Sequence, residues 1–297
     1  MADSLVKHNP NHKVVIVLLD HYNGYDPAYF LPHTIVPIAS MQIPELEEMN
    51  ARYDIFELSC ALKPYVIEYF LNNDPEIESV YYFDADILVY NSLEESDKFL
   101  AQNSIVLTPH IFSPIPLDGL FPSEEVLLRS GIYNAGFIGV SRSAETFSFL
   151  RWWKERMLTK CFNDVPNGLF VDQLWLDFVP LFFSKVNIIR HPGYNVAYWN
   201  YNERSIIQQE NNFLINQSFP LVFYHYSGFD IYNPDSISIH QNRYSINDNP
   251  AYHALFDEYV NRVLLNNHER FKQIPASFGI KKKKQGAKKK FFQTFFR

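Results

Sequence analysis

Two aspartates that follow an apolar run have the clearest chemical potential in this sequence. The stretch "SVYYFDADILVY" places Asp84 and Asp86 one residue apart, directly after residues 80–83. Alternate residues of an extended chain face the same side, so both carboxylates can point to one place. Like charges this close repel each other unless a cation lies between them. Mg²⁺ and Mn²⁺ bind carboxylate oxygens and keep positions open for substrate phosphates. The pair therefore indicates a metal site, and a helix cap or turn is the simpler alternative.

A phosphatase interpretation of the same pair stays open. Haloacid-dehalogenase-type phosphatases also carry an Asp-x-Asp after an apolar strand and use the first aspartate, here Asp84, as nucleophile. They have Thr or Val two residues after the second aspartate, where this chain has Leu88. They also have a later acidic pair, which we do not identify here. This class therefore ranks second among the enzymes considered.

Further polar residues lie at the ends of predicted strands and helices. His225 ends an apolar run, and imidazole is a good ligand for Mn²⁺, although a structural histidine is the simpler interpretation. Asn134 lies on a strand with glycines inside it, which often mark close approach of a ligand. Asp172 and Gln173 begin a predicted helix, which Asp172 would otherwise cap. Lys63 is either a point charge for a phosphate or an ordinary surface lysine.

The elements that must position these residues alternate between strands and helices. Apolar runs predict strands at residues 14–19, 79–83, 104–110, 131–141, 187–192 and 220–228. Helical spacing of apolar residues predicts helices at residues 57–73, 144–160, 170–183 and 251–268. In the first helix, Pro64 is expected near the first turn. This order predicts an α/β fold with a mostly parallel sheet, in which ligands bind beyond the carboxyl ends of the strands.

Composition limits the classes to which the chain can belong. Its 297 residues suit one large α/β domain or two small ones, and 47% hydrophobic residues can form a substantial core. Cys60 and Cys161 lie outside any CxxC pattern, which argues against a disulfide scaffold or a structural zinc site and fits a reducing compartment. No apolar segment resembles a signal peptide or a membrane span, so we expect a cytoplasmic protein.

The charge is unevenly distributed along the chain. The net charge is -7, yet residues 271–297 hold nine basic residues and no acid, so the body is strongly acidic. This pattern argues against a nucleic-acid partner. The tail "KKKKQGAKKKFFQTFFR" predicts either a disordered segment or peripheral attachment to an anionic inner membrane surface, where each lysine is worth about 1 kcal/mol.

Five stretches together resemble bacterial GT-A-fold glycosyltransferases similar to family 8, which includes lipopolysaccharide galactosyltransferases and glycogenin-like enzymes. They are "YYFDADILVYNSL", "YNAGFIGVSRS", "GLFVDQLWLD", "GYNVAYWN" and "FYHYSGFD", in that order. The resemblance covers most of residues 1–268. It implies a Rossmann-like GT-A domain over residues 1–270 and a basic, aromatic tail over residues 271–297. It also implies that the first strand of the fold is missing, because residues 2–10 correspond to the helix that follows it.

The resemblance implies a role for each matching residue. The metal ligands for Mn²⁺ or Mg²⁺ would be Asp84, Asp86 and His225. The donor-binding residues would be Lys63, Asp84, Asn134, Gly136 and Gly228. The catalytic candidates would be Asp172 and Gln173, which would stabilise an oxocarbenium-like centre in a reaction that retains configuration. The Lys-Pro-Trp ending of the family is missing here, so a second lysine for the diphosphate is not identified.

The sequence thus predicts a metal-dependent transferase of cell-surface polysaccharide or lipopolysaccharide synthesis. It would move a sugar from a nucleotide donor, with UDP favoured over GDP, to a glycan or lipid-linked acceptor. Two alternatives stay open. One is the phosphatase that uses Asp84, and the other is an inactive, truncated remnant that binds glycans without turnover and without metal.

Overall fold

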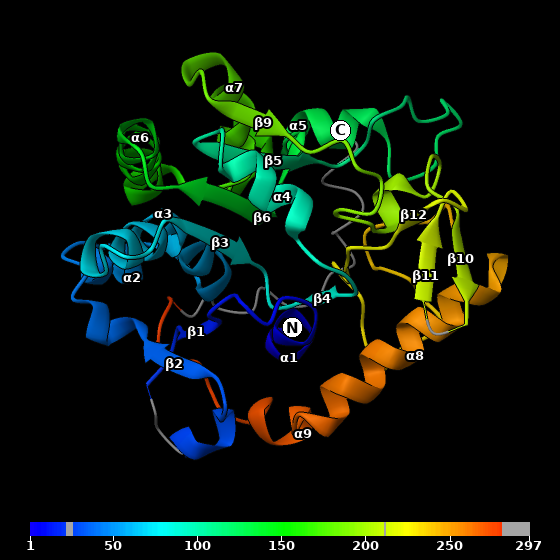
Figure 1. Cartoon of the computed structure of the whole chain (residues 1–297), viewed down its shortest axis with the longest axis horizontal. Helices are drawn as coiled ribbons and strands as arrows, with labels where there is room; N and C mark the ends of the chain where they lie inside the picture. The colour runs from blue at the N-terminus through cyan, green and yellow to red at the C-terminus, as the bar shows by residue number, and fades with distance from the viewer. Residues whose placement is uncertain (22–25, 211, 281–297) are drawn as a thin grey trace.

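The computed structural model describes residues 1–21, 26–210 and 212–280 (Figure 1). The predicted membrane-binding segment, residues 281–297, lies outside the described residues. Within them, no helix is long and apolar enough to cross a membrane.

A four-stranded mixed sheet forms the centre of the fold. Its strands are, in spatial order, β3 (Ser79–Phe83), β6 (Tyr133–Ser141), β5 (Ile105–Pro109) and β9 (Val186–Ile188). β6 is antiparallel to both β3 and β5, and only β5 and β9 are parallel. The expected mostly parallel sheet is therefore wrong for these strands. The chain enters β6 at the end of the sheet where β5 finishes, with Pro109 opposite Tyr133. The two strands therefore run antiparallel.

The remaining strands form small sheets around this one. β4 pairs antiparallel with β13, β1 pairs parallel with β2, and the other pairings are antiparallel. Their bounds are β1 (Val15–Leu18), β2 (Thr34–Pro37), β4 (Ile87–Val89), β7 (Asn163–Asp164), β8 (Leu169–Phe170), β10 (Ile206–Gln209), β11 (Asn212–Ile215), β12 (Phe219–Pro220) and β13 (Phe223–His225). The chain is thus an α/β protein with several small sheets.

Two long helices cover one face of the central sheet, α3 (Ile55–Asn73) and α6 (Ala144–Lys160), which pack against each other (Figure 1). α3 starts at a capping box in which Asp54 accepts from the Glu57 amide. Pro64 lies in the middle of α3, nine residues after its first residue Ile55, so the expected place near the first turn is wrong.

The other helices are short, apart from one. They are α1 (Ala2–His8), α2 (Leu46–Arg52), α4 (Glu94–Leu100), α5 (Glu124–Ser130), α7 (Val179–Phe182), α8 (Pro250–Leu265) and α9 (His268–Phe271). α8 confirms the predicted terminal helix, and it packs beside β10. The single helix expected at residues 170–183 is wrong. Val171 takes a positive φ of 38°, and a 3₁₀ turn at Leu174–Phe178 leads into α7.

The buried side chains form three clusters that meet near the link from β3 to β4. One lies between the central sheet and the helices α3 and α6, with Trp153 and Phe149 fully buried. A second, rich in tyrosine, lies under α8, and a third lies around β4 and α1. β3 belongs to the central sheet and β4 to the pair with β13, and side chains of both strands pack in the third cluster. The link at residues 84–86 therefore joins two sheets that share part of the core.

Candidate functional site

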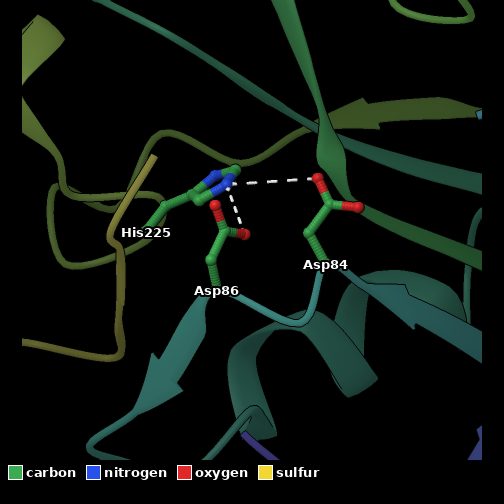
Figure 2. A group of neighbouring side chains, drawn as sticks. All are labelled: Asp84, Asp86 and His225. Atoms are coloured by element: carbon green, nitrogen blue, oxygen red, sulfur yellow. Dashed lines mark ion pairs between the residues drawn. The ribbon is translucent and has the colours of Figure 1, made fainter. Parts of the chain in front are cut away.

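The link from β3 to β4 holds Asp84 and Asp86, and each is fixed to a different sheet (Figure 2). The Asp84 amide donates to the Gly136 carbonyl on β6, at 2.8 Å. The Asp86 carbonyl accepts from the Tyr226 amide, just after β13, at 2.9 Å. The strand ends therefore hold both carboxylates in place.

His225, the last residue of β13, completes the cluster with Asp84 and Asp86. Its Nε2 atom lies 3.1 Å from Asp86 Oδ1 and 4.0 Å from Asp84 Oδ2 (Figure 2). One ligand atom from each of the three residues lies within 4.8 Å of the others. The predicted metal ligands thus come together, although they lie far apart in the sequence. Two carboxylates and one imidazole can together hold a divalent cation.

The electrostatics of the cluster favour its charged forms. Burial alone would lower the pKa of His225, but the carboxylate of Asp86 raises that pKa above its ordinary value. Burial alone would raise the pKa of Asp86, but the charge and hydrogen bond of His225 lower it. His225 is therefore protonated more readily than a free histidine, so binding of a cation at its ring would release a proton.

Gly136 leaves the space that this cluster occupies. A Cβ atom at this position would lie 2.5 Å from His225 Cε1 and 2.9 Å from Asp84 Oδ2. Contacts this short do not occur without a shift of the neighbouring atoms. The glycine inside the predicted strand thus lets the side chains of Asp84 and His225 approach the backbone of β6 closely. Gly136 itself lines the cavity.

Lys63 lies buried on α3 and connects two acids. Its ammonium is 2.9 Å from Asp172 Oδ2 and 3.5 Å from Asp84 Oδ1. It also donates to the Ala135 carbonyl at 3.0 Å, and lies 4.7 Å from the centre of the Tyr82 ring. Burial would lower the pKa of Lys63, but Asp172 and Asp84 hold it well above its usual value. The surface-lysine alternative is therefore wrong, because this side chain is only 4% exposed.

Asp172 and Gln173 lie in the turn after β8 and directly precede the 3₁₀ helix Leu174–Phe178, whose N-cap is Gln173 without a side-chain cap hydrogen bond. Asp172 is 1% exposed, and burial raises its pKa even with Lys63 beside it. Gln173 Oε1 accepts from the Ala135 amide at 3.2 Å, and Nε2 donates to the Ser130 carbonyl at 3.0 Å. Gln173 thus connects β6 to the end of α5.

Asn134 is held by the backbone and by a histidine that the sequence analysis missed. Its Oδ1 accepts from the Gly136 amide at 3.0 Å, and its Nδ2 lies 3.2 Å from His110 Nε2. His110 Nδ1 lies 2.9 Å from the Ile132 carbonyl and must donate to it, so Nε2 accepts from Asn134. Burial lowers the pKa of His110 to about 4, which keeps it neutral. Its only signal in the sequence is its place after the strand that ends at Pro109.

Trp199 is a second residue that the sequence analysis missed. Its ring lies edge-on to His110 and to His225, with centroids 5.0 and 5.3 Å away. It belongs to the stretch "GYNVAYWN", which the analysis noted without giving the tryptophan a role. Trp199 thus contacts both histidines of the site, and all three rings line the same cavity.

These residues line one cavity of about 840 Å³. Eight of the nine predicted site residues are among its lining residues: Lys63, Asp84, Asp86, Asn134, Gly136, Asp172, Gln173 and His225. Gly228 is not among the described residues that line it. It takes a φ of +69° and packs on Ser238 and His240, so its contact with a donor stays a prediction.

The comparisons with known proteins place the chain among its relatives. No protein-family model matches it. Over 238 residues it is 30% identical to the uncharacterized protein YfnF of Bacillus subtilis (strain 168), in an alignment that spans 77% of this chain and 75% of YfnF. The chain belongs to the YfnF family. The uncharacterized protein YfnD of the same organism is similar as well, with 24% identity over 286 residues, or 94% of this chain and 86% of YfnD.

The names of these two relatives state no activity. The residues that line the cavity of this YfnF family member show which reactions it can support. One part of the cavity offers a cation site at Asp84, Asp86 and His225. A buried acid, Asp172, lies across Lys63 from Asp84. Such an arrangement can hold a cation with an anionic ligand, and it can place a carboxylate near the reacting atoms.

Proposed function

We propose that the chain is a metal-dependent glycosyltransferase of the GT-A type that uses a nucleotide sugar, with UDP favoured over GDP, and retains configuration. The acceptor would be a glycan or a lipid-linked precursor. The observation that carries this proposal is the convergence of Asp84, Asp86 and His225 on one side of a cavity of about 840 Å³. The resemblance of five stretches to family 8 enzymes, two of which contain these three residues, also supports it.

The cation site accounts for the donor end of this reaction. A bound Mn²⁺ or Mg²⁺ would neutralise the charge that develops on a diphosphate leaving group. The two carboxylates are partly exposed, at 31% and 40%, while the His225 side chain is only 5% exposed. Asp84 and Asp86 therefore face the space that a donor would enter. The His225 side chain is buried beside them and contacts Asp86.

Lys63 has a positioning role in this proposal. An ammonium has three hydrogens to donate, and Lys63 lies near three oxygens, on Asp172, Asp84 and the Ala135 carbonyl. It holds the two acids at fixed positions and adds positive charge to the donor end. A direct contact with phosphate would require it to give up one of these partners.

Asp172 and Gln173 are the residues proposed to face the transferred sugar. The Gln173 amide is held at both ends, by Ala135 and Ser130, which fixes its orientation. Asp172 brings a negative charge that would stabilise an oxocarbenium-like centre. A preorganised carboxylate and amide act without the cost of reorienting during the reaction.

The phosphatase alternative requires Asp84 as an attacking nucleophile. Asp84 Oδ1 accepts from the Tyr82 hydroxyl at 2.8 Å and pairs with Lys63, while Oδ2 faces His225. Both oxygens are thus directed at donors or cations, which favours a ligand role over attack on a phosphorus atom.

Product release from sugar nucleotides tests this proposal. The purified protein is incubated with UDP-hexoses and GDP-hexoses and with Mn²⁺, and the released nucleoside diphosphate is measured beside phosphate release from p-nitrophenyl phosphate. We expect release of one diphosphate, which stops with EDTA and in Asp86→Asn. Phosphate release that depends on Asp84 would support the phosphatase instead. Sugar binding with no turnover of either substrate would support the glycan-binding remnant.

A further inference from the structure

The charges that line the cavity are confined to one end of it. Among the described lining residues, the Asp, Glu, Lys and Arg side chains are Lys63, Asp84, Asp86 and Asp172. Lys63 pairs with Asp84 and Asp172, and Asp86 joins them through His225. They form one connected cluster, so the rest of the cavity wall carries none of these charged side chains.

The first turns of α3 show which way the charged end lies. Phe56, Cys60 and Lys63 are four and three residues apart, which places them on one face of the helix, and all three line the cavity. Their exposed fractions fall from 49% to 5% and 4%. The seven steps along the helix from Phe56 to Lys63 span about 10 Å. Along this helix the cavity wall therefore changes from an exposed apolar side chain at Phe56 to a buried charge at Lys63.

Two other elements make the wall near the mouth apolar. α5 and the loop before it contribute Pro122, Val126 and Leu127. The β7–β8 hairpin contributes three apolar residues and one polar one: Val165, Pro166, Phe170 and Asn163. α5 packs on β8, so these two elements form one continuous surface. We define the apolar entrance as the part of the cavity lined by six residues: Phe56, Val126, Leu127, Val165, Pro166 and Phe170.

The apolar entrance offers few partners to hydroxyl groups. Ser130, the nearest polar side chain on α5, donates its hydroxyl to the Val126 carbonyl of its own helix. Asn163, on β7, is the other polar side chain near this set of residues. A bare sugar placed here would lose water and gain few hydrogen bonds in return, which is unfavourable. An alkyl or aryl group would instead bury apolar surface, which is favourable.

Gln173 lies at the boundary between the two ends. Its Oε1 accepts from Ala135, next to the cation site, and its Nε2 donates to Ser130, at the end of α5. If the donor diphosphate lies at the charged end, the sugar to be transferred reaches Gln173. What lies beyond Gln173, against the apolar entrance, is then the acceptor.

We propose that the acceptor carries an alkyl or aryl group close to the hydroxyl that it presents, and that this group lies against the apolar entrance. The inference rests on the proposed glycosyltransferase function and specifies its acceptor class. A lipid-linked precursor and an aromatic aglycone would both present such a group, so the experiment must separate a long chain from a compact ring.

Binding of matched glucosides tests the inference. Methyl, phenyl and octyl β-D-glucoside, the last below its micelle concentration, are titrated by ligand-observed NMR into the full chain with Mn²⁺. We expect the phenyl or the octyl compound to bind at least about tenfold more tightly than the methyl compound. A preference for phenyl indicates a compact aromatic acceptor, and a preference for octyl indicates a lipid chain.

Variants locate the effect within the cavity. Phe170→Ser and Val126→Ser are expected to remove most of the preference for the apolar group. Leu181→Ser, which changes an apolar residue of α7 that is 77% exposed and outside the cavity lining, is the matched control and is expected to keep it. Equal or undetectable binding of the three glucosides, or an unchanged preference in both entrance variants, would overturn the inference.

A parallel titration with UDP or GDP and Mn²⁺ separates the two proposals. Nucleotide binding without any preference for the apolar group overturns only the acceptor class. A preference for the apolar group without nucleotide binding overturns the glycosyltransferase proposal, and with it the assignment of this group to an acceptor.

Discussion

The buried ion pair of Lys63 and Asp172 leads to a stability prediction that can be worked out from the structure. Their side chains are 4% and 1% exposed, and the charged atoms are 2.9 Å apart. Lys63→Met removes the ammonium and leaves the carboxylate buried without its cation. Breaking a buried pair in this way costs about 3–5 kcal/mol.

The pH sets an upper limit on this cost, because Asp172 can take up a proton instead. Each pH unit above the unfolded pKa of about 3.9 makes protonation about 1.4 kcal/mol more costly, so the limit is about 4 kcal/mol at pH 7 and about 1.5 kcal/mol at pH 5. Burial raises the folded-state pKa of Asp172, and loss of Lys63 raises it further. The folded state then binds more protons than the unfolded state, so the stability of the variant falls as the pH rises from about 4.

Urea unfolding, followed by circular dichroism at pH 5 and pH 7, measures this loss. We expect Lys63→Met to lose much more stability at pH 7 than at pH 5, and the double variant with Asp172→Asn to lose less than Lys63→Met alone at pH 7. Lys98→Met, which breaks an exposed pair with Glu94, is the control and is expected to change little. An equal loss at both pH values, or a double variant no more stable than the single one, would refute the reasoning.

Three further predictions concern the surroundings of the site. Burial lowers the folded-state pKa of His110 to about 4. His110 should therefore make the free energy of unfolding fall by up to about 3 kcal/mol as the pH is lowered from 6.5 to 4. In urea unfolding, His110→Gln should show a smaller fall over the same pH range. Gly136→Ala should weaken Mn²⁺ binding at least about tenfold in a calorimetric titration, since its Cβ would lie 2.5 Å from His225. Arg243→Gln removes an ion pair and hydrogen bonds with residues 116–122, so limited proteolysis should cut there faster while Mn²⁺ affinity is kept.

Each of these predictions has an outcome that contradicts it. For His110, this is an unchanged pH dependence in the variant, and for Arg243 an unchanged cleavage pattern. Gly119→Ala is the control for Gly136→Ala, because its Cβ would meet nothing within 4 Å, although its φ of +77° disfavours alanine. Mn²⁺ binding equal to that of the unsubstituted protein in Gly136→Ala would show that the close packing around His225 is not needed.

The sequence carries good signals for residues that end a strand. Asp84 and Asp86 follow an apolar run, and His225 ends another, so each could be singled out locally. Their meeting could not be derived from periodicity, because it depends on the pairing of β4 with β13, between segments far apart in the chain. The resemblance to family 8 stretches, not the local pattern, grouped them in advance.

Other features depend on interactions that local patterns do not reveal. The direction of β6 depends on how the chain returns after β5, which the alternation of strands and helices leaves open. Val171, the second residue of the helix expected at residues 170–183, takes a positive φ that a β-branched residue rarely adopts and that breaks the start of this helix. A clear signal was present but unused at Asp54 and Glu57, which form the capping box and place Lys63 in the buried middle of α3.

The central claim is that Asp84, Asp86 and His225 bind a divalent cation together with a nucleotide. Calorimetric titration of UDP and of GDP into the purified chain, with and without Mn²⁺ and beside the Asp86→Ala variant, tests it most directly. We expect one nucleotide to bind only when Mn²⁺ is present, and this binding to be lost in the variant. Binding of neither nucleotide, or binding that is the same with and without Mn²⁺ and in Asp86→Ala, would contradict the claim.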